Sequence, residues 1–193
     1  FATMSALALE HGAINLGQGF PDTDGPSEVL DAAVAAIRGG RNQYPPGPGV
    51  PELLAAIAAH QRRFYGIEVD PSREILVTVG ATEAIAATIL ALCGPGDEVV
   101  SLEPYYDSYP AAIAMAGARR VPVTLRAPDF AFDVERFRAA ITPPTRLVLL
   151  NTPHNPTGKV FTREELTALA EVVLEHDLVV MTDEVYEHLV YDA

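Results

Sequence analysis

The sequence has little that would point to an exported or membrane-bound protein. It contains a single cysteine, so no internal disulfide can form, and a reducing cytoplasm is the compartment that we expect. No apolar run approaches the roughly 18 residues that a membrane-spanning helix needs. The first residues, FATMSALALEHGA, lack a basic segment and predict a short amphipathic helix rather than a signal peptide. These absences favour a cytoplasmic protein that does not enter a membrane.

Basic residues are also scarce. Lysine and arginine number 13 against 26 acidic residues, which gives a net charge of −13. A basic stripe for nucleic acid is therefore absent, and we expect no such partner. The five histidines show no metal-ligand spacing, so we expect no metal site. Cys93 follows an apolar run and predicts a buried helix end rather than a catalytic thiol, and Lys159 is the only lysine.

Short apolar runs alternate with longer helical patterns from about residue 75 onward. Runs of this kind, separated by helices, are typical of a parallel sheet with helices on both faces. Pro122 suits only an edge strand or a bulge, and Thr162 with Glu165 predicts a capping box. The predicted strands are 75–79, 98–102, 119–125, 146–150 and 178–183, and the predicted helices are 81–93, 105–117, 134–141 and 162–177. The residues before this region predict two amphipathic helices, 25–40 and 49–66, joined by a loop rich in proline and glycine.

Polar and aromatic side chains follow four of the predicted strands, where ligands bind in open α/β sheets. Each group has a simpler structural explanation: a glycine-assisted turn, a hydrophobic helix start, a stiff loop or a helix cap. Together they suit one ligand, a planar phosphorylated pyridine with a protonated ring nitrogen. The groups are Gly80-Ala81-Thr82, the tyrosines of EPYYDSY (103–109), Asn151 and Asn155 in NTPHNPTGK (151–159), and Asp183 followed by Glu184 and Tyr186.

The sequence resembles the fold-type I, pyridoxal-phosphate-dependent aminotransferases of class I/II over essentially its whole length. The resemblance favours the kynurenine, glutamine and methionine aminotransferase branch and the actinobacterial N-succinyldiaminopimelate aminotransferases. It implies transfer of an amino group between an amino acid and a 2-oxo acid, with pyridoxal 5′-phosphate as cofactor, by a homodimer. The motifs that carry it are NLGQGFPD, NQYPPGPG, VGATEA, EPYYDSY, NTPHNPTGK and TDEVYEHLVYD.

The resemblance also implies a role for individual residues. Asp183 pairs with the pyridine nitrogen and keeps it protonated. Tyr186 and Asn155 bind the phenolic oxygen of the cofactor, and Tyr106 stacks on its ring. The other implied contacts are Ala81 and Thr82 with the phosphate, Tyr44 with the phosphate of the partner subunit, and Gly19 together with Asn155 with the substrate carboxylate.

The sequence departs from the family pattern in one respect: it does not contain the lysine that forms a Schiff base with the cofactor. Its only lysine, Lys159, lies in the NPTGK turn, and the lysine of that turn does not have this role in the family. We therefore expect residues 1–25 to join a small domain and 26–193 to form part of the large, cofactor-binding domain. On this interpretation the chain is the N-terminal half of an enzyme and is inactive alone. Two alternatives stay open: a carbon–sulfur β-lyase with the same cofactor, and a non-catalytic binding or dimerisation module.

Overall fold

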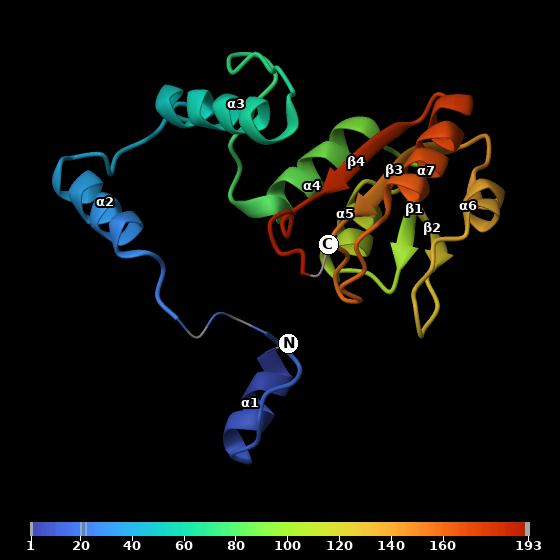
Figure 1. Cartoon of the computed structure of the whole chain (residues 1–193), viewed down its shortest axis with the longest axis horizontal. Helices are drawn as coiled ribbons and strands as arrows, with labels where there is room; N and C mark the ends of the chain where they lie inside the picture. Colours follow the sequence, from blue (N-terminus) through green and yellow to red (C-terminus); the bar gives the residue numbers. More distant parts are fainter. Residues whose placement is uncertain (1, 20, 22, 192–193) are drawn as a thin grey trace. The chain divides into compact units, whose positions relative to one another are not determined.

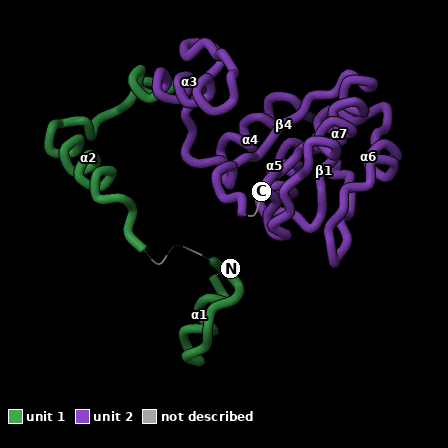
Figure 2. The backbone as a smooth tube through the Cα atoms, in the orientation of Figure 1, with its two compact units in different colours: residues 1–53 green, residues 54–193 purple. Residues whose placement is uncertain are grey.

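The computed structural model describes residues 2–19, 21 and 23–191. Phe20 and Asp22 of the NLGQGFPD motif, and Asp192 of the last motif, therefore lie outside the described residues. The chain divides into two compact units, residues 1–53 and 54–193 (Figure 2). Each unit is described by itself.

The first unit contains the helices α1 (Ala2–Glu10) and α2 (Ser27–Arg38). Helix α3 (Pro51–Tyr65) begins in this unit and continues into the second. The three predicted N-terminal helices are thus confirmed. No residue described in α1 or α2 is buried, so the apolar side chains of both helices are available for contacts outside their own unit.

The second unit is built around a parallel sheet of four strands in the order β2-β1-β3-β4 (Figure 1). Every pair of neighbouring strands in it is parallel. Pro122 lies on β2, an edge strand, as its missing N–H requires. The strands are β1 (Glu98–Glu103), β2 (Arg119–Thr124), β3 (Thr145–Asn151) and β4 (Val179–Asp183).

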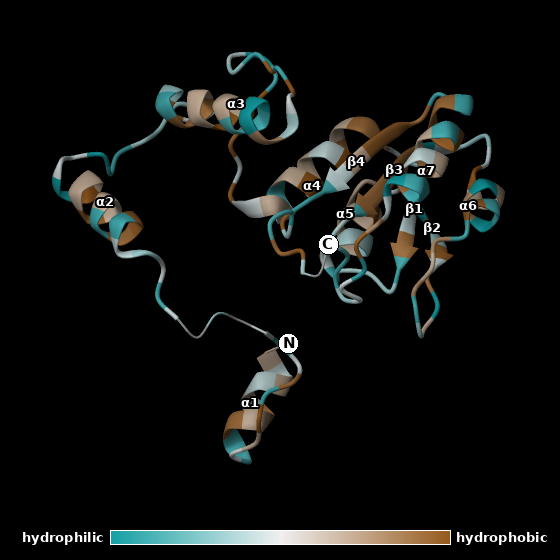
Figure 3. Cartoon of the chain, in the orientation of Figure 1, coloured by the Kyte–Doolittle hydropathy of each residue, from teal (hydrophilic) through white to brown (hydrophobic). Residues whose placement is uncertain are grey.

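Helices cover both faces of this sheet, and alternate residues of the central strands point to opposite faces. Val99, Leu147 and Leu149 pack against α4 (Gly80–Leu92) and α5 (Ser108–Met115). On the opposite face, α6 (Val134–Ala140) and α7 (Arg163–Glu175) pack against the sheet. Their cluster includes Val100, Leu102, Val148, Leu150, Phe137, Leu169 and Val172. The predicted fold class, an α/β sheet covered on both faces, is confirmed, and Figure 3 shows the apolar colour concentrated in the strands.

The local signals in the sequence are largely confirmed. The Thr162 side chain accepts from the Glu165 N–H while the Glu165 side chain accepts from the Thr162 N–H, which completes the capping box of α7. Pro110 is the third residue of α5, within the first turn, where no intrahelical N–H bond is lost. Helix α5 begins three residues later than expected, and Tyr105 instead lies against the Arg120 guanidinium, 4.2 Å from the ring centroid.

The predicted strand 75–79 is wrong. These residues precede α4 without belonging to any strand, and Leu76 and Val79 are largely exposed. A strand exists only where its backbone bonds to a neighbouring strand, and in the described part of the chain the sheet pairs only the four strands above. A short run of apolar and β-branched residues is therefore not enough by itself to predict a strand. None of the described helices combines the length and the apolar character needed to cross a bilayer.

Candidate active site

A cavity of about 150 Å³ lies beside the carboxyl ends of β3 and β4 and the N-terminal turn of α4. It brings together eight of the residues that the sequence analysis selected. The expectation that Thr82 and Asp183 face one crevice is thereby confirmed. The cavity is lined by Ala81, Thr82, Ile85, Tyr106, Tyr109, Asn151, Asn155, Asp183, Val185 and Tyr186.

Asp183, the last residue of β4, is held by two donors. The Tyr109 hydroxyl donates to Oδ2 at 2.6 Å, and the Val185 N–H donates to Oδ1 at 3.3 Å. Tyr109 is only 2% exposed. Burial, followed by the hydrogen bond to Asp183, raises the pKa of Tyr109 well above its usual value. Tyr109 therefore keeps its proton and donates it to the carboxylate, while the remaining lone pairs of Asp183 stay available to a cation.

Asn151 explains why the loop after β3 is stiff. Its side chain is buried, with 3% of the residue exposed. The amide nitrogen donates to the Asp183 carbonyl at 2.9 Å, and the amide oxygen accepts from the Asn155 N–H at 2.6 Å. The Thr152 N–H also donates to the Asp183 carbonyl, at 3.1 Å. The first asparagine of NTPHNPTGK thus ties the second to the end of β4 and fixes where Asn155 stands in the cavity.

The distal half of the same loop is closed by its own hydrogen bonds. The Gly158 N–H donates to the His154 carbonyl at 2.7 Å, and the His154 N–H donates to the Lys159 carbonyl at 2.8 Å. The Lys159 ammonium forms an ion pair with Glu165 at 2.8 Å. Lys159 is not among the residues that line the cavity.

The N-terminus of α4 presents backbone N–H groups beside small side chains. Gly80 begins the helix with a φ of +76°, a conformation that side-chain-bearing residues rarely adopt. The Thr78 hydroxyl donates to the Gly80 carbonyl at 2.9 Å. Ala81 and Thr82 are exposed and line the cavity. Free N–H groups at a helix start attract anions, so this edge of the cavity suits a phosphate.

Three tyrosines supply the aromatic surface of the cavity. The Tyr106 and Tyr109 rings meet edge to face, with centroids 5.8 Å apart and planes at 73°. The Tyr109 hydroxyl is hydrogen-bonded to Asp183. Tyr106 is half-buried, and its ring is the one available to stack on a flat ligand. Tyr186 lies on the segment after β4.

Two selected residues, Gly19 and Tyr44, belong to the unit of residues 1–53 and do not line this cavity. Tyr44 is fully exposed. Two lining residues, Ile85 and Val185, were not selected from the sequence, and Tyr109 and Asn151 were selected only as strand-end groups, without a role of their own. Helical spacing could have indicated Ile85, because it follows Thr82 by three positions, about one turn of α4.

The residues present fit a planar, phosphorylated pyridine. A cavity of about 150 Å³ accommodates a benzene-sized ring. A carboxylate, an amide and a phenol can bind groups on the ring edge, an aromatic ring can stack on its face, and a helix N-terminus can bind the phosphate.

Comparison with known proteins agrees with this geometry. Residues 11–193 match the family model described as "Aminotransferase class I and II". The chain is 60% identical over 195 residues to the probable N-succinyldiaminopimelate aminotransferase of Mycobacterium tuberculosis, covering 100% of this chain and 49% of that protein. It is 46% identical over 189 residues to the methionine aminotransferase of Escherichia coli, covering 98% of this chain and 49% of that protein.

Solved structures show the same similarity. The N-succinyldiaminopimelate aminotransferase structure from Mycobacterium tuberculosis superposes with a TM-score of 0.96 at 58% identity, covering 99% of this chain and 50% of that one. The chain thus spans about half the length of the curated relatives that it matches.

Proposed function

Because the chain belongs to the class I and II aminotransferase family, we propose that the full-length protein transfers an amino group between an amino acid and a 2-oxo acid. The family assignment confirms the resemblance drawn from the sequence motifs. We also propose pyridoxal 5′-phosphate as its cofactor. The observation that carries the proposal is the cavity in which Asp183, Asn155 and Tyr186 converge with the N-terminus of α4.

Asp183 is the central residue of the proposed mechanism. When bound, pyridoxal phosphate supplies a pyridinium ring that withdraws electrons from the substrate α-carbon. The Asp183 carboxylate would hold the proton on the ring nitrogen, because an opposite charge within hydrogen-bond reach favours the protonated form. Tyr109 and Asn151 hold Asp183 in place through its carboxylate and its carbonyl.

The other lining residues would position the cofactor and the substrate. Tyr186 and Asn155 would hydrogen-bond the phenolic oxygen, and Asn155 would also bind the substrate carboxylate. Tyr106 would stack on the ring. The phosphate would lie against the N–H groups of Ala81 and Thr82, at the start of α4.

The proposal extends to the residues outside this cavity. Tyr44 would bind the phosphate in a partner subunit, and Gly19 would bind the substrate carboxylate, so the working unit would be a homodimer. Residues 1–25 would join a small domain, and 26–193 would form part of the large domain. The exposed apolar side chains of α2, Val29, Leu30, Val34 and Ile37, support contacts of this kind.

The sequence resemblance assigns the Schiff base to a lysine, and no lysine is among the residues that line the cavity. Lys159 is the only lysine of the chain and is paired with Glu165. We therefore propose that a lysine elsewhere in the full-length protein binds the cofactor and moves the proton at the α-carbon.

The test is Asp183→Asn in the full-length protein, with Glu184→Gln, an exposed neighbour, as the control. The amide is nearly isosteric with the carboxylate, so the fold should persist. Loss of the α-proton in single-turnover experiments should slow by several orders of magnitude, because electrostatic stabilisation is usually the largest catalytic contribution. Cofactor affinity should fall less, since the phosphate and stacking contacts remain. Unchanged rates of α-proton loss would remove Asp183 from the mechanism.

Product analysis separates the alternatives. An aminotransferase returns the carbon skeleton of the donor as a 2-oxo acid, whereas a β-lyase releases a thiol from a sulfur-containing donor. A non-catalytic module would give neither product.

A further inference from the structure

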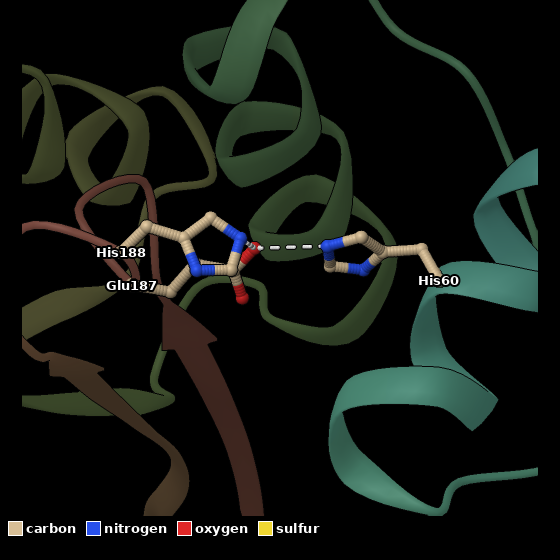
Figure 4. Close-up of side chains that lie close together, drawn as sticks. All are labelled: His60, Glu187 and His188. Carbon is tan, nitrogen blue, oxygen red and sulfur yellow. Dashed lines mark ion pairs between the residues drawn. The ribbon is translucent and has the colours of Figure 1, made fainter.

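Three side chains that can bind a metal ion converge outside the cavity, where α3 meets the segment after β4 (Figure 4). His60 comes from α3, and Glu187 and His188 come from the segment that follows Asp183. One ligand atom from each lies within 4.8 Å of those of the other two. All three residues belong to the unit of residues 54–193, and none of them lines the active-site cavity.

The distances resemble those between two ligands of one ion. Glu187 Oε1 lies 3.8 Å from His60 Nε2 and 3.4 Å from His188 Nε2. Direct charge-assisted hydrogen bonds would bring such atoms to about 2.8 Å. In a tetrahedral zinc site with bonds of about 2.0–2.1 Å, neighbouring ligand atoms lie about 3.3 Å apart. The observed distances between the carboxylate oxygen and the two imidazole nitrogens are therefore closer to those expected between ligands of one ion than to those expected in hydrogen-bonded ion pairs.

The neighbouring residues orient these ligands. The Tyr65 hydroxyl donates to Glu187 Oε2. One carboxylate oxygen is thus engaged, and the other, Oε1, faces both imidazoles. The His60 ring packs on Phe64, with centroids 4.6 Å apart, and meets the His188 ring edge-on at 5.7 Å. Glu187 thus has the hydrogen-bonded support that is typical of a ligating carboxylate, and ring packing restricts His60.

Some adjustment is needed, and the side chains can supply it. The three ligand atoms all lie within 4.8 Å of one another, so bringing them to about 3.3 Å requires a movement of no more than about 1.5 Å. The His188 side chain is 57% exposed and the His60 side chain 34% exposed. The His188 ring is the more exposed, so it can make most of this movement while the His60 ring stays packed on Phe64.

We propose that His60, Glu187 and His188 bind a zinc ion that ties α3 to the segment carrying Tyr186. Two imidazoles and one carboxylate are a ligand set that zinc adopts, with water in the fourth position. Calcium and magnesium prefer oxygen ligands alone, so two imidazoles select against them. Because Glu187 directly follows Tyr186, the ion would restrain the residue that we propose to bind the cofactor. This inference goes beyond the proposed aminotransferase activity and does not depend on it.

Zinc binding to the full-length protein, freed of cofactor and metal, can be measured by titration calorimetry with zinc chloride. We expect one ion per chain in the wild type. His60→Ala should weaken binding by about tenfold or more, the lower limit for removing even an indirect partner. His176→Ala, at the end of α7 and outside the cluster, is the matched control and should leave the affinity unchanged.

A second variant tests the arrangement without removing a ligand. Tyr65→Phe frees Glu187 Oε2 and should weaken zinc binding by about 10–100-fold. Glu187→Gln replaces His60→Ala if that variant fails to fold. X-ray absorption at the zinc edge should show two imidazole ligands with nitrogen at about 2.0 Å. A wild-type protein that binds no zinc, or equal affinity in the wild type and His60→Ala, would overturn the proposal.

Discussion

At the scale of single residues, the contact between Tyr109 and Asp183 connects α5 to the end of β4. The hydroxyl is buried and donates to the carboxylate at 2.6 Å. A hydrogen bond to a charged group contributes more to stability than one between neutral groups. The hydrogen bond between Tyr109 and Asp183 therefore stabilises the fold and also orients the carboxylate that faces the cavity.

Tyr109→Phe removes this donor and leaves the ring in place. We expect the full-length protein to lose about 1.5–3 kcal/mol of unfolding free energy, measured by urea denaturation. Tyr105→Phe is the control, because that ring lies against Arg120 at an exposed position. This variant should lose no more than about 0.5 kcal/mol of unfolding free energy. Equal stability of Tyr109→Phe and the wild type would show that the hydrogen bond contributes nothing.

At the scale of secondary-structure elements, Glu165 joins three segments. Its carboxylate accepts from Lys159 Nζ at 2.8 Å, from the Thr162 N–H at 2.9 Å and from the Phe132 N–H at 3.1 Å. The capping box of α7 therefore also anchors the loop that carries Asn155. The sequence pattern predicted the cap, but the contact with Phe132 depends on the fold.

This arrangement predicts a stability that depends on pH. Burial alone would raise the pKa of Glu165, but the bonds from Lys159 and the two backbone N–H groups outweigh it and lower the pKa. A carboxylate with a lowered folded pKa stabilises the protein above its unfolded pKa of about 4.3, and this contribution disappears as the pH falls through the folded value.

Glu165→Gln should therefore lower the unfolding free energy by roughly 1.5–3 kcal/mol at pH 7. The difference from the wild type should shrink below about pH 4, where Glu165 becomes protonated. Thermal denaturation at several pH values measures both effects. Glu171→Gln, exposed on the same helix, is the control. A difference that stays constant with pH would contradict the proposed role of the charge.

At the scale of the whole molecule, the two units differ in how much they bury. The unit of residues 54–193 contains two apolar clusters, one on each face of its sheet. In the unit of residues 1–53, Ile14 and Leu16 are 87% and 92% exposed, and Tyr44 is fully exposed. Exposed apolar residues are typical of contact surfaces where they form a contiguous patch. The exposure of Ile14 and Leu16 supports the proposed packing of residues 1–25 in a small domain, and that of Tyr44 supports its proposed contact with a partner subunit.

Tyr44→Phe in the full-length protein tests that proposal. If the Tyr44 hydroxyl binds the phosphate of a partner subunit, its loss should weaken cofactor binding by about 1–3 kcal/mol. Equilibrium dialysis measures the affinity, and sedimentation measures the oligomeric state. A protein that sediments as a monomer and retains its cofactor normally would contradict both the dimer and the role of Tyr44.

The sequence by itself determined most of the alternation of strands and helices, the cap at Thr162 and most residues of the cavity, and it limited Pro122 to an edge strand or a bulge. These features follow from local chemistry: backbone geometry, apolar periodicity and the motifs at strand ends. Tertiary structure alone decided that residues 75–79 pair with no strand in the described chain. It also decided that Tyr109 and Asn151 hold Asp183, and that His60 meets His188. Such contacts join residues far apart in the chain, and their existence depends on how packed elements bring side chains together, which no local pattern records.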